Sequence, residues 1–200
     1  MDARPAHERN RIIGMVVLFA AMFSGIALLW DRQFGFLKET LVAPVPRLSI
    51  MVGRSLGGAT VAMLQGILMI AACLVAGFRP ASLAALPLGL LFMALIATLF
   101  VALGVAIGSG LQDMQGFQLI MSFLVMPIFF FSGALFPLDH LPRALAAVAD
   151  VDPLTYGVDG LRRALIGVGH FAVATDLAVL VAVSVALLCV GAWRFSRIEV

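Results

Sequence analysis

Charged residues are scarce in this sequence. Of its 200 residues only 12% are Asp, Glu, Lys or Arg, whereas 62% are hydrophobic, and the mean hydropathy is +1.10. A soluble domain has roughly 25% charged and roughly 45–50% apolar residues, so this chain has too little polar surface for a water-soluble globule. Its formal net charge is +2, and the basic residues lie between apolar runs rather than in one patch with aromatics, which excludes nucleic-acid binding.

Cysteine and the common catalytic motifs are also scarce. Cys73 and Cys189 each lie inside an apolar run, and neither belongs to a CxxC pair or a Cys/His cluster with zinc-ligand spacing. The sequence has no GxxxxGK[ST] phosphate-binding loop and no HExxH. We therefore expect no metal, no other cofactor and no catalytic residue. Any ATP hydrolysis that drives the protein is expected in a separate subunit.

What the sequence does have is long uncharged runs. A helix of about 20 apolar residues crosses a bilayer core of about 30 Å, and a charge at its centre costs about 2.5–3.5 kcal/mol on the insertion scale. Five runs meet this requirement, and they are apolar all round, as expected for helices in lipid. The sequence predicts an all-α integral membrane protein with about five transmembrane helices in a single domain, 1–200. The predicted spans are approximately residues 12–30, 55–78, 83–108, 115–136 and 171–193.

Glycine pairs occur within these runs at a spacing of four. Gly53 and Gly57 form one pair, and Gly104 and Gly108 form another. Small residues at this spacing let membrane helices approach closely, so both pairs are predicted to be packing contacts.

The connection at residues 31–47 has the pattern of a short amphipathic helix. Its apolar residues Phe34, Leu37 and Leu41 follow an i, i+3, i+7 spacing, and Pro44 with Pro46 would end the helix. From these residues alone, the helix could lie on anionic lipid headgroups or dock on a partner protein.

The connection at residues 139–166 contains signals for helix ends. Asp152 is a predicted N-cap with Pro153 at the first helical position, and Arg162 and Arg163 precede Gly167 as at a helix end. We expect two short helices in the membrane interface.

Three segments, in this order, resemble the permeases of type-2 ABC exporters. Residues 30–47 read WDRQFGFLKETLVAPVPR, residues 131–138 read FSGALFPL and residues 152–162 read DPLTYGVDGLR. They are similar to that family's acidic–basic pair with its Pro-Val-Ser-Arg turn, its Ser-Gly-x-x-Phe-Pro segment and its Asn-Pro-Leu-Thr-Tyr-x-x-Asp-x-Leu-Arg segment. The likeness extends over nearly the whole chain. Within the family, the sequence looks most similar to the daunorubicin-resistance and nodulation-factor export branch.

The resemblance implies a role for each connection. Residues 31–47 would be a cytoplasmic coupling helix that docks on a separate ABC ATPase subunit, and residues 139–166 would be two short extracytoplasmic helices before the last span. The implied ATPase-coupling residues are Asp31, Arg32, Phe34, Gly35, Leu37, Lys38, Glu39, Leu41 and Pro44. The implied extracytoplasmic structural motif consists of Gly133, Pro137, Pro153, Tyr156, Asp159 and Arg162.

The resemblance also implies the activity and the partners. Members of the family usually have six spans, so this sequence corresponds to a permease that lacks the first. Two permeases, identical or related, enclose a pathway that exports an amphipathic or lipid-linked substrate, such as a drug, an antibiotic or a glycolipid, across the cytoplasmic (inner) membrane. Two alternatives remain open. One is a truncated subunit that assembles without transporting, and the other is an ion-coupled carrier, which the lack of acids at the span centres disfavours.

Overall fold

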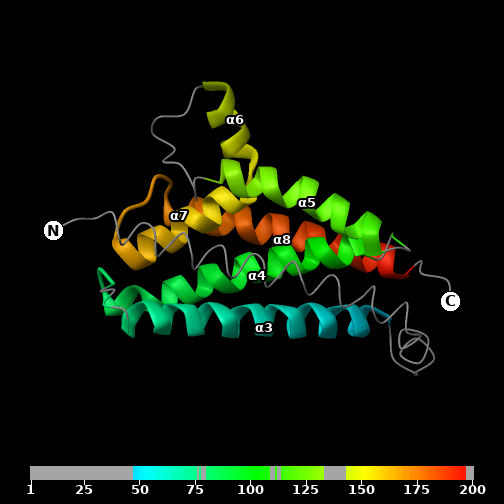
Figure 1. Ribbon diagram of the computed structural model, residues 1–200, viewed down its shortest axis with the longest axis horizontal. Coiled ribbons are helices and arrows are strands. Elements are labelled where there is room, and N and C mark those ends of the chain that lie inside the picture. Colours follow the sequence, from blue (N-terminus) through cyan, green and yellow to red (C-terminus); the bar gives the residue numbers. More distant parts are fainter. Residues whose placement is uncertain are drawn as a thin grey trace.

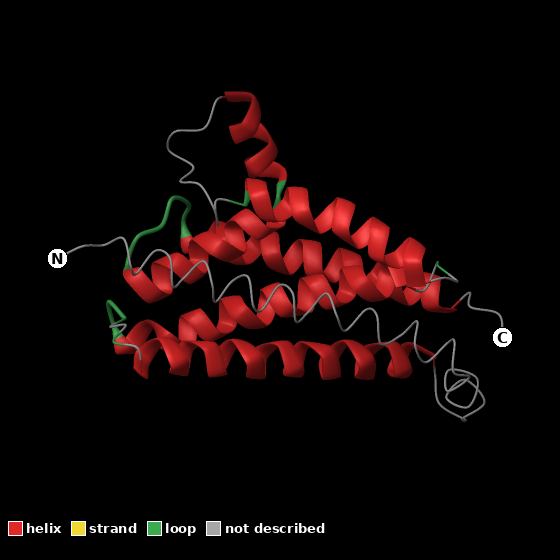
Figure 2. Cartoon of the chain, viewed as in Figure 1, coloured by secondary structure: helices red, strands yellow, loops and turns green. Residues whose placement is uncertain are grey.

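The computed structural model of the chain describes residues 47–75, 77, 80–108, 111, 114–132 and 143–196. The regular structure in these ranges is entirely helical (Figures 1 and 2), which confirms the all-α prediction. In chain order the elements are α3 (Arg47–Val75), the 3₁₀ helix η1 (Leu83–Ala85), α4 (Leu86–Gly108), α5 (Met114–Phe131), α6 (Arg143–Val151), α7 (Pro153–Ile166) and α8 (Val173–Ser196).

Three segments of the described chain are long and apolar enough to cross a membrane, namely Ser55–Val75, Leu83–Ile107 and Val173–Arg194. Helix α5 adds a shorter apolar stretch, Gln115–Phe131. The fold is therefore that of a multi-pass integral membrane protein. The predicted span 12–30 lies outside the described residues, and the predicted span 115–136 is described only as far as residue 132.

Helix α4 is the centre of the bundle and packs against α3, α7 and α8. Its side chains Phe92, Met93, Ile96 and Phe100 are all 0% exposed. Because α4 has neighbours on several sides, its sequence can be apolar all round without a polar stripe.

The outer helices keep large apolar side chains on their outward faces. Leu56, Leu64 and Leu68 on α3 are each about 60% exposed, and Val185 and Trp193 on α8 are more than half exposed. In water such faces would favour association. In a bilayer the same faces are covered by lipid tails, so the distribution fits a membrane-embedded bundle.

The ends of the bundle differ in character. The first turn of α3 and the last turn of α8 lie at one end, whereas α6 and α7 lie at the opposite end, where α6 projects away from the long helices (Figure 1). Helix α3 begins at Arg47, so the described chain enters the bundle at the end away from α6 and α7.

Helix α7 is placed by close contact with α4. A Cβ atom added to Gly157 would lie 2.6 Å from Cγ1 of Ile96, and one added to Gly160 would overlap the ring of Phe92. The glycines therefore let the two backbones approach closely. By contrast, Gly53 and Gly57 on α3, which were predicted to be packing contacts, have no atom of the described chain within 4 Å of an added Cβ.

Candidate functional site

The implied ATPase-coupling residues, Asp31 through Pro44, lie outside the described residues, and their role stays a prediction. Of the extracytoplasmic motif, Gly133 and Pro137 also lie outside. The other four members, Pro153, Tyr156, Asp159 and Arg162, all lie on α7. Helix α7 and the loop that follows it are therefore the part of the predicted site that the structure describes.

Local sequence signals define both ends of α7. The Asp152 side chain caps its N-terminus by accepting a hydrogen bond from the backbone N–H of Leu154 at 2.9 Å, and Pro153 occupies the first turn. At the other end Gly167 adopts a left-handed conformation with φ of +77° and donates its N–H to the carbonyl of Arg163. Both caps were predicted from the sequence.

Asp159 anchors the loop between α7 and α8. Its side chain is 1% exposed, and both carboxylate oxygens accept the backbone N–H of His170 at 2.8 Å. One of them also accepts the N–H of Phe171 at 3.0 Å. A carboxylate that accepts backbone N–H groups forms strong charge-assisted hydrogen bonds, so Asp159 fixes the loop that leads into the last span.

Arg163 holds the same loop through a different group. Its Nη2 donates to the backbone carbonyl of Phe171, and Gly169 packs so closely on the guanidinium that a Cβ there would overlap it. The sequence analysis placed both Arg162 and Arg163 near the helix end and included Arg162 in the implied structural motif. Both side chains are partly buried, and the sequence did not show that Arg163 binds the loop.

Tyr156 connects α7 to the end of α6. Its hydroxyl donates to the backbone carbonyl of Asp150 at 2.7 Å, and its ring lies 4.9 Å from that of Phe171. The His170 ring packs edge-on against the other side of this cluster, 4.8 Å from Phe171. The Tyr156 hydroxyl thus joins α7 to α6, and the ring contact between Tyr156 and Phe171 joins α7 to the loop.

Asp176, in the first turn of α8, is a further buried carboxylate near the loop between α7 and α8. It is 0% exposed, and neither carboxylate oxygen has a hydrogen-bond partner among the described residues. Asp159 and Arg163 are the charged groups that act on it, and a negative charge is favoured at a helix N-terminus. The sequence analysis gave Asp176 no role because its partners are distant in the chain.

The contacts of α7 hold neighbouring helices together. Hydrogen bonds from α7, its aromatic contacts and its glycine packing join the α6–α7 pair to α4 and α8. Within the described ranges no group of three or more His, Cys, Asp or Glu could hold a metal ion.

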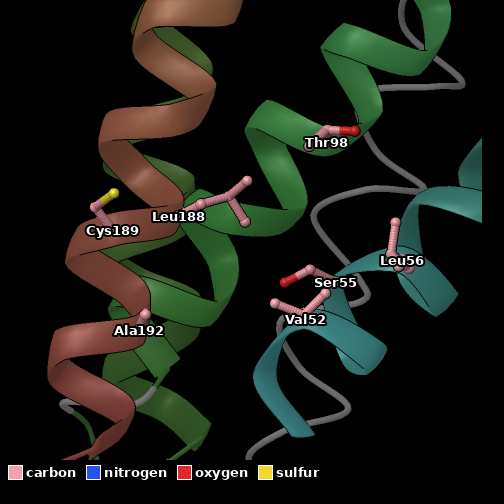
Figure 3. A pocket seen from close by; sticks show the side chains of 7 residues that line it. All are labelled: Val52, Ser55, Leu56, Thr98, Leu188, Cys189 and Ala192. Atoms are coloured by element: carbon pink, nitrogen blue, oxygen red, sulfur yellow. The ribbon is translucent and has the colours of Figure 1, made fainter. Parts of the chain in front are cut away.

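A cavity of about 190 Å³ lies between α3, α4 and α8 (Figure 3). Ser55 on α3 faces into it with a buried hydroxyl that has no hydrogen-bond partner, whereas the hydroxyl of Thr98 on α4 donates to the carbonyl of Ala94 at 2.7 Å. The remaining lining, which includes Val52 and Leu188, is apolar. The cavity lies within the bundle and has the apolar character expected of packed membrane helices.

Comparison with known proteins gives consistent matches. A family profile described as "ABC-2 type transporter" matches residues 4–166. The chain is 30% identical over 152 residues to the putative transport permease ycf38 of Porphyra purpurea, covering 76% of this chain and 52% of the relative. It is 29% identical over 155 residues to the inner membrane transport permease YadH of Escherichia coli (strain K12), covering 76% and 60%. It is also 29% identical over 160 residues to nodulation protein J of Rhizobium leguminosarum bv. viciae, covering 78% and 60%. The chain thus spans between about half and three-fifths of the length of these relatives.

Proposed function

Because the chain belongs to the ABC-2 type transporter family, we propose that it is the membrane-spanning subunit of an ATP-driven exporter whose ATP is hydrolysed by a separate ABC ATPase subunit. The sequence has no phosphate-binding loop, and its described part is a bundle of apolar helices. The observation that carries the proposal most directly is that the chain joins α3 at one end of the bundle, whereas α6 and α7 lie at the other. A force applied to residues 31–47 would therefore act at the end opposite to the external helix pair.

The coupling helix is the proposed site of that force. Phe34, Leu37 and Leu41 would fill a groove on the ATPase, and Lys38 with Glu39 would form polar contacts at its rim. Helix α3 starts at Arg47 and packs along α4. A displacement of the coupling helix would thus be transmitted through α3 to the central helix by rigid-body movement.

A second permease copy or a related chain is proposed to cover α5. Within the described chain α5 has few contacts, and its large apolar side chains form an exposed stripe. Phe123 is 83% exposed, and Leu119, Met126 and Phe130 are each about half exposed. These four residues follow an i, i+4, i+7, i+11 spacing and so lie on one helix face. Burial of this face between two permeases would enclose an apolar pathway.

The cargo proposed for this pathway is an amphipathic or lipid-linked molecule, of drug, antibiotic or glycolipid type, moved across the cytoplasmic membrane. An apolar wall suits such molecules because their apolar part leaves water on entry. The assembly would be a multi-pass complex of two permeases and their ATPase subunits.

The coupling role is tested with a partner ATPase from the same cell. The double variant Leu37→Asp, Leu41→Asp places two charges on the apolar face, and we expect it to abolish co-purification of the ATPase and its transporter-dependent hydrolysis. Thr40→Asp, on the polar face, is the matched control and should leave both unchanged. Unaltered assembly and hydrolysis in the double variant would refute the coupling role.

The same preparation separates export from assembly alone. Uptake of a labelled amphipathic substrate into inverted vesicles, whose cytoplasmic face is outward, should require ATP, the ATPase and an intact coupling helix. A complex that assembles and hydrolyses ATP without moving substrate would instead identify a non-transporting subunit.

A further inference from the structure

The loop between α7 and α8 is held at Phe171 from two sides. The backbone N–H of Phe171 donates to the Asp159 carboxylate at 3.0 Å, and its carbonyl accepts a hydrogen bond from Nη2 of Arg163. Asp159 and Arg163 are four residues apart on α7, so they lie on the same helix face. Two opposite charges on one helix therefore fix the segment that leads into the last span.

A buried carboxylate without a donor lies close to this clamp. Asp176, in the first turn of α8, is 0% exposed, and neither of its oxygens has a hydrogen-bond partner in the described chain. A carboxylate in this position is costly, because it has lost its water and gained no hydrogen bond in return. A rearrangement that brings a donor to Asp176 would recover part of that cost.

Arg163 is the donor that can reach it. Helices α3, α4 and α7 pack on α8, but α4 has no ionisable side chain and the apolar span of α3 has only Cys73. On α7, Asp159 is itself negative, and the hydroxyl of Tyr156 already donates to a backbone carbonyl. Arg163 is the positive charge that acts on Asp176, and its Nε is buried without a hydrogen-bond partner among the described residues.

The guanidinium of Arg163 thus has two possible acceptors. At Phe171 it donates to a neutral carbonyl, whereas at Asp176 it would donate to a carboxylate, with which arginine often forms two parallel hydrogen bonds. Turning to Asp176 would also relieve the close packing of Gly169 on the guanidinium. It would leave the Phe171 carbonyl without its donor, so each position satisfies a group that the other leaves unpaired.

We propose that Arg163 is a two-position latch at the start of the last span. In the position that the structure shows, it holds the loop at Phe171. In the second position it pairs with Asp176, and Asp159 remains as the anchor of a loop that then opens more readily, while α7 stays packed on α4. The latch depends on contacts within this chain and goes beyond coupling to an ATPase, so loss of coupling would leave it intact.

The test is amide hydrogen exchange of the full chain in detergent, read by mass spectrometry with fragmentation that resolves His170 and Phe171. Asp176→Asn keeps the shape of the side chain but removes the charge that attracts Arg163. Exchange at the two amides should slow about tenfold or more, because the charge-assisted pair no longer stabilises the second position. A purely structural role for Asp176 predicts faster exchange instead, since its negative charge is favourable at the N-terminus of α8.

The matched control removes a carboxylate that the latch does not use. Asp150 is exposed, and its backbone carbonyl rather than its side chain binds Tyr156. Asp150→Asn should therefore leave exchange at the two loop amides within about twofold of the unmodified chain.

Two further variants complete the design. Arg163→Met removes the latch itself, so exchange should be faster, and adding Asp176→Asn to this variant should no longer slow it. Asp176→Ser removes the same charge with a smaller side chain, which keeps the test valid should the Asn variant not fold. Unchanged or faster exchange in the neutral variants of Asp176 would overturn the proposal. Equal slowing by Asp176→Asn in the absence of Arg163 would also overturn it.

Discussion

The contact between α7 and α4 gives a sharp prediction, because it depends on the absence of one side chain. Gly160→Ala would place a methyl group on Cε1 and Cζ of Phe92. The Phe92 ring is 0% exposed in the core, so it has no open space into which it can turn. The added methyl must therefore displace a helix or force the ring off its rotamer.

The expected magnitude follows from two opposing effects. Overpacking a close-packed core costs about 1–3 kcal/mol, and an overlap of this severity belongs at the upper end. Alanine stabilises a helix interior by about 1 kcal/mol relative to glycine. We expect Gly160→Ala to lower the free energy of unfolding by about 2 kcal/mol. Gly57→Ala, in the interior of α3 with open space around it, should raise it by up to about 1 kcal/mol.

The assay is thermal unfolding in detergent, followed by a thiol-reactive fluorophore. Cys73 is buried and Cys189 is exposed, so in a Cys189→Ala background the dye reports unfolding through Cys73. For a chain of this size 1 kcal/mol shifts Tm by about 2–4 °C, and the two glycine variants should therefore differ by roughly 6–12 °C. Equal Tm values would show that α7 does not pack on Phe92 as described. Phe92→Leu in the Gly160→Ala background should restore part of the loss, because it removes the overlapping ring atoms.

Two further predictions concern the carboxylates of Asp159, on α7, and of Asp152, which caps that helix. Asp159→Asn replaces an acceptor by an NH₂ group that faces backbone donors, so amide hydrogen exchange at His170 and Phe171 should accelerate by at least about tenfold, while Asp150→Asn leaves it unchanged. Burial raises the folded-state pKa of Asp152 from 3.8 to about 7, so the contribution of this group to stability is full below about pH 4 and is lost as pH rises to about 7, by at most about 4 kcal/mol. Circular-dichroism melts between pH 5 and 8 should show this loss in the unmodified chain and a smaller one in Asp152→Asn; parallel curves would contradict the assignment.

The features that the sequence predicted well are those encoded by neighbouring residues. Hydropathy is a local property, and the caps at Asp152 and Gly167 need only a few adjacent residues. Both caps are confirmed. The contacts of Asp159 were not predictable, since its partners His170 and Phe171 come eleven and twelve residues later. The resemblance indicated that Asp159 matters without indicating what it binds.

The glycines show that their spacing in the sequence does not by itself predict which of them contact a neighbouring helix. Gly53 and Gly57 have the expected small-residue spacing but meet no neighbour in the described part of the chain, whereas Gly157 and Gly160, three residues apart, make the close contact with α4. Which glycine touches a neighbour depends on how the helices are oriented around one another, and that follows from the whole bundle. The same limit applies to Arg163, whose loop partner Phe171 comes eight residues later in the chain.

The described contacts divide the bundle into a firmly joined part and a lightly joined one. Helix α7 is fixed to α4 by Gly157 and Gly160 and to the start of α8 by Asp159 and Arg163, so these three helices form one tightly linked unit. Helix α5 shares only limited contacts with α4, α6 and α7. Packed cores resist continuous deformation, whereas weakly packed interfaces can shift between arrangements. In the proposed cycle, the element that moves relative to the α4–α7–α8 unit is therefore α5. Because α5 also carries the exposed apolar stripe, its movement would shift the face proposed to meet the second permease.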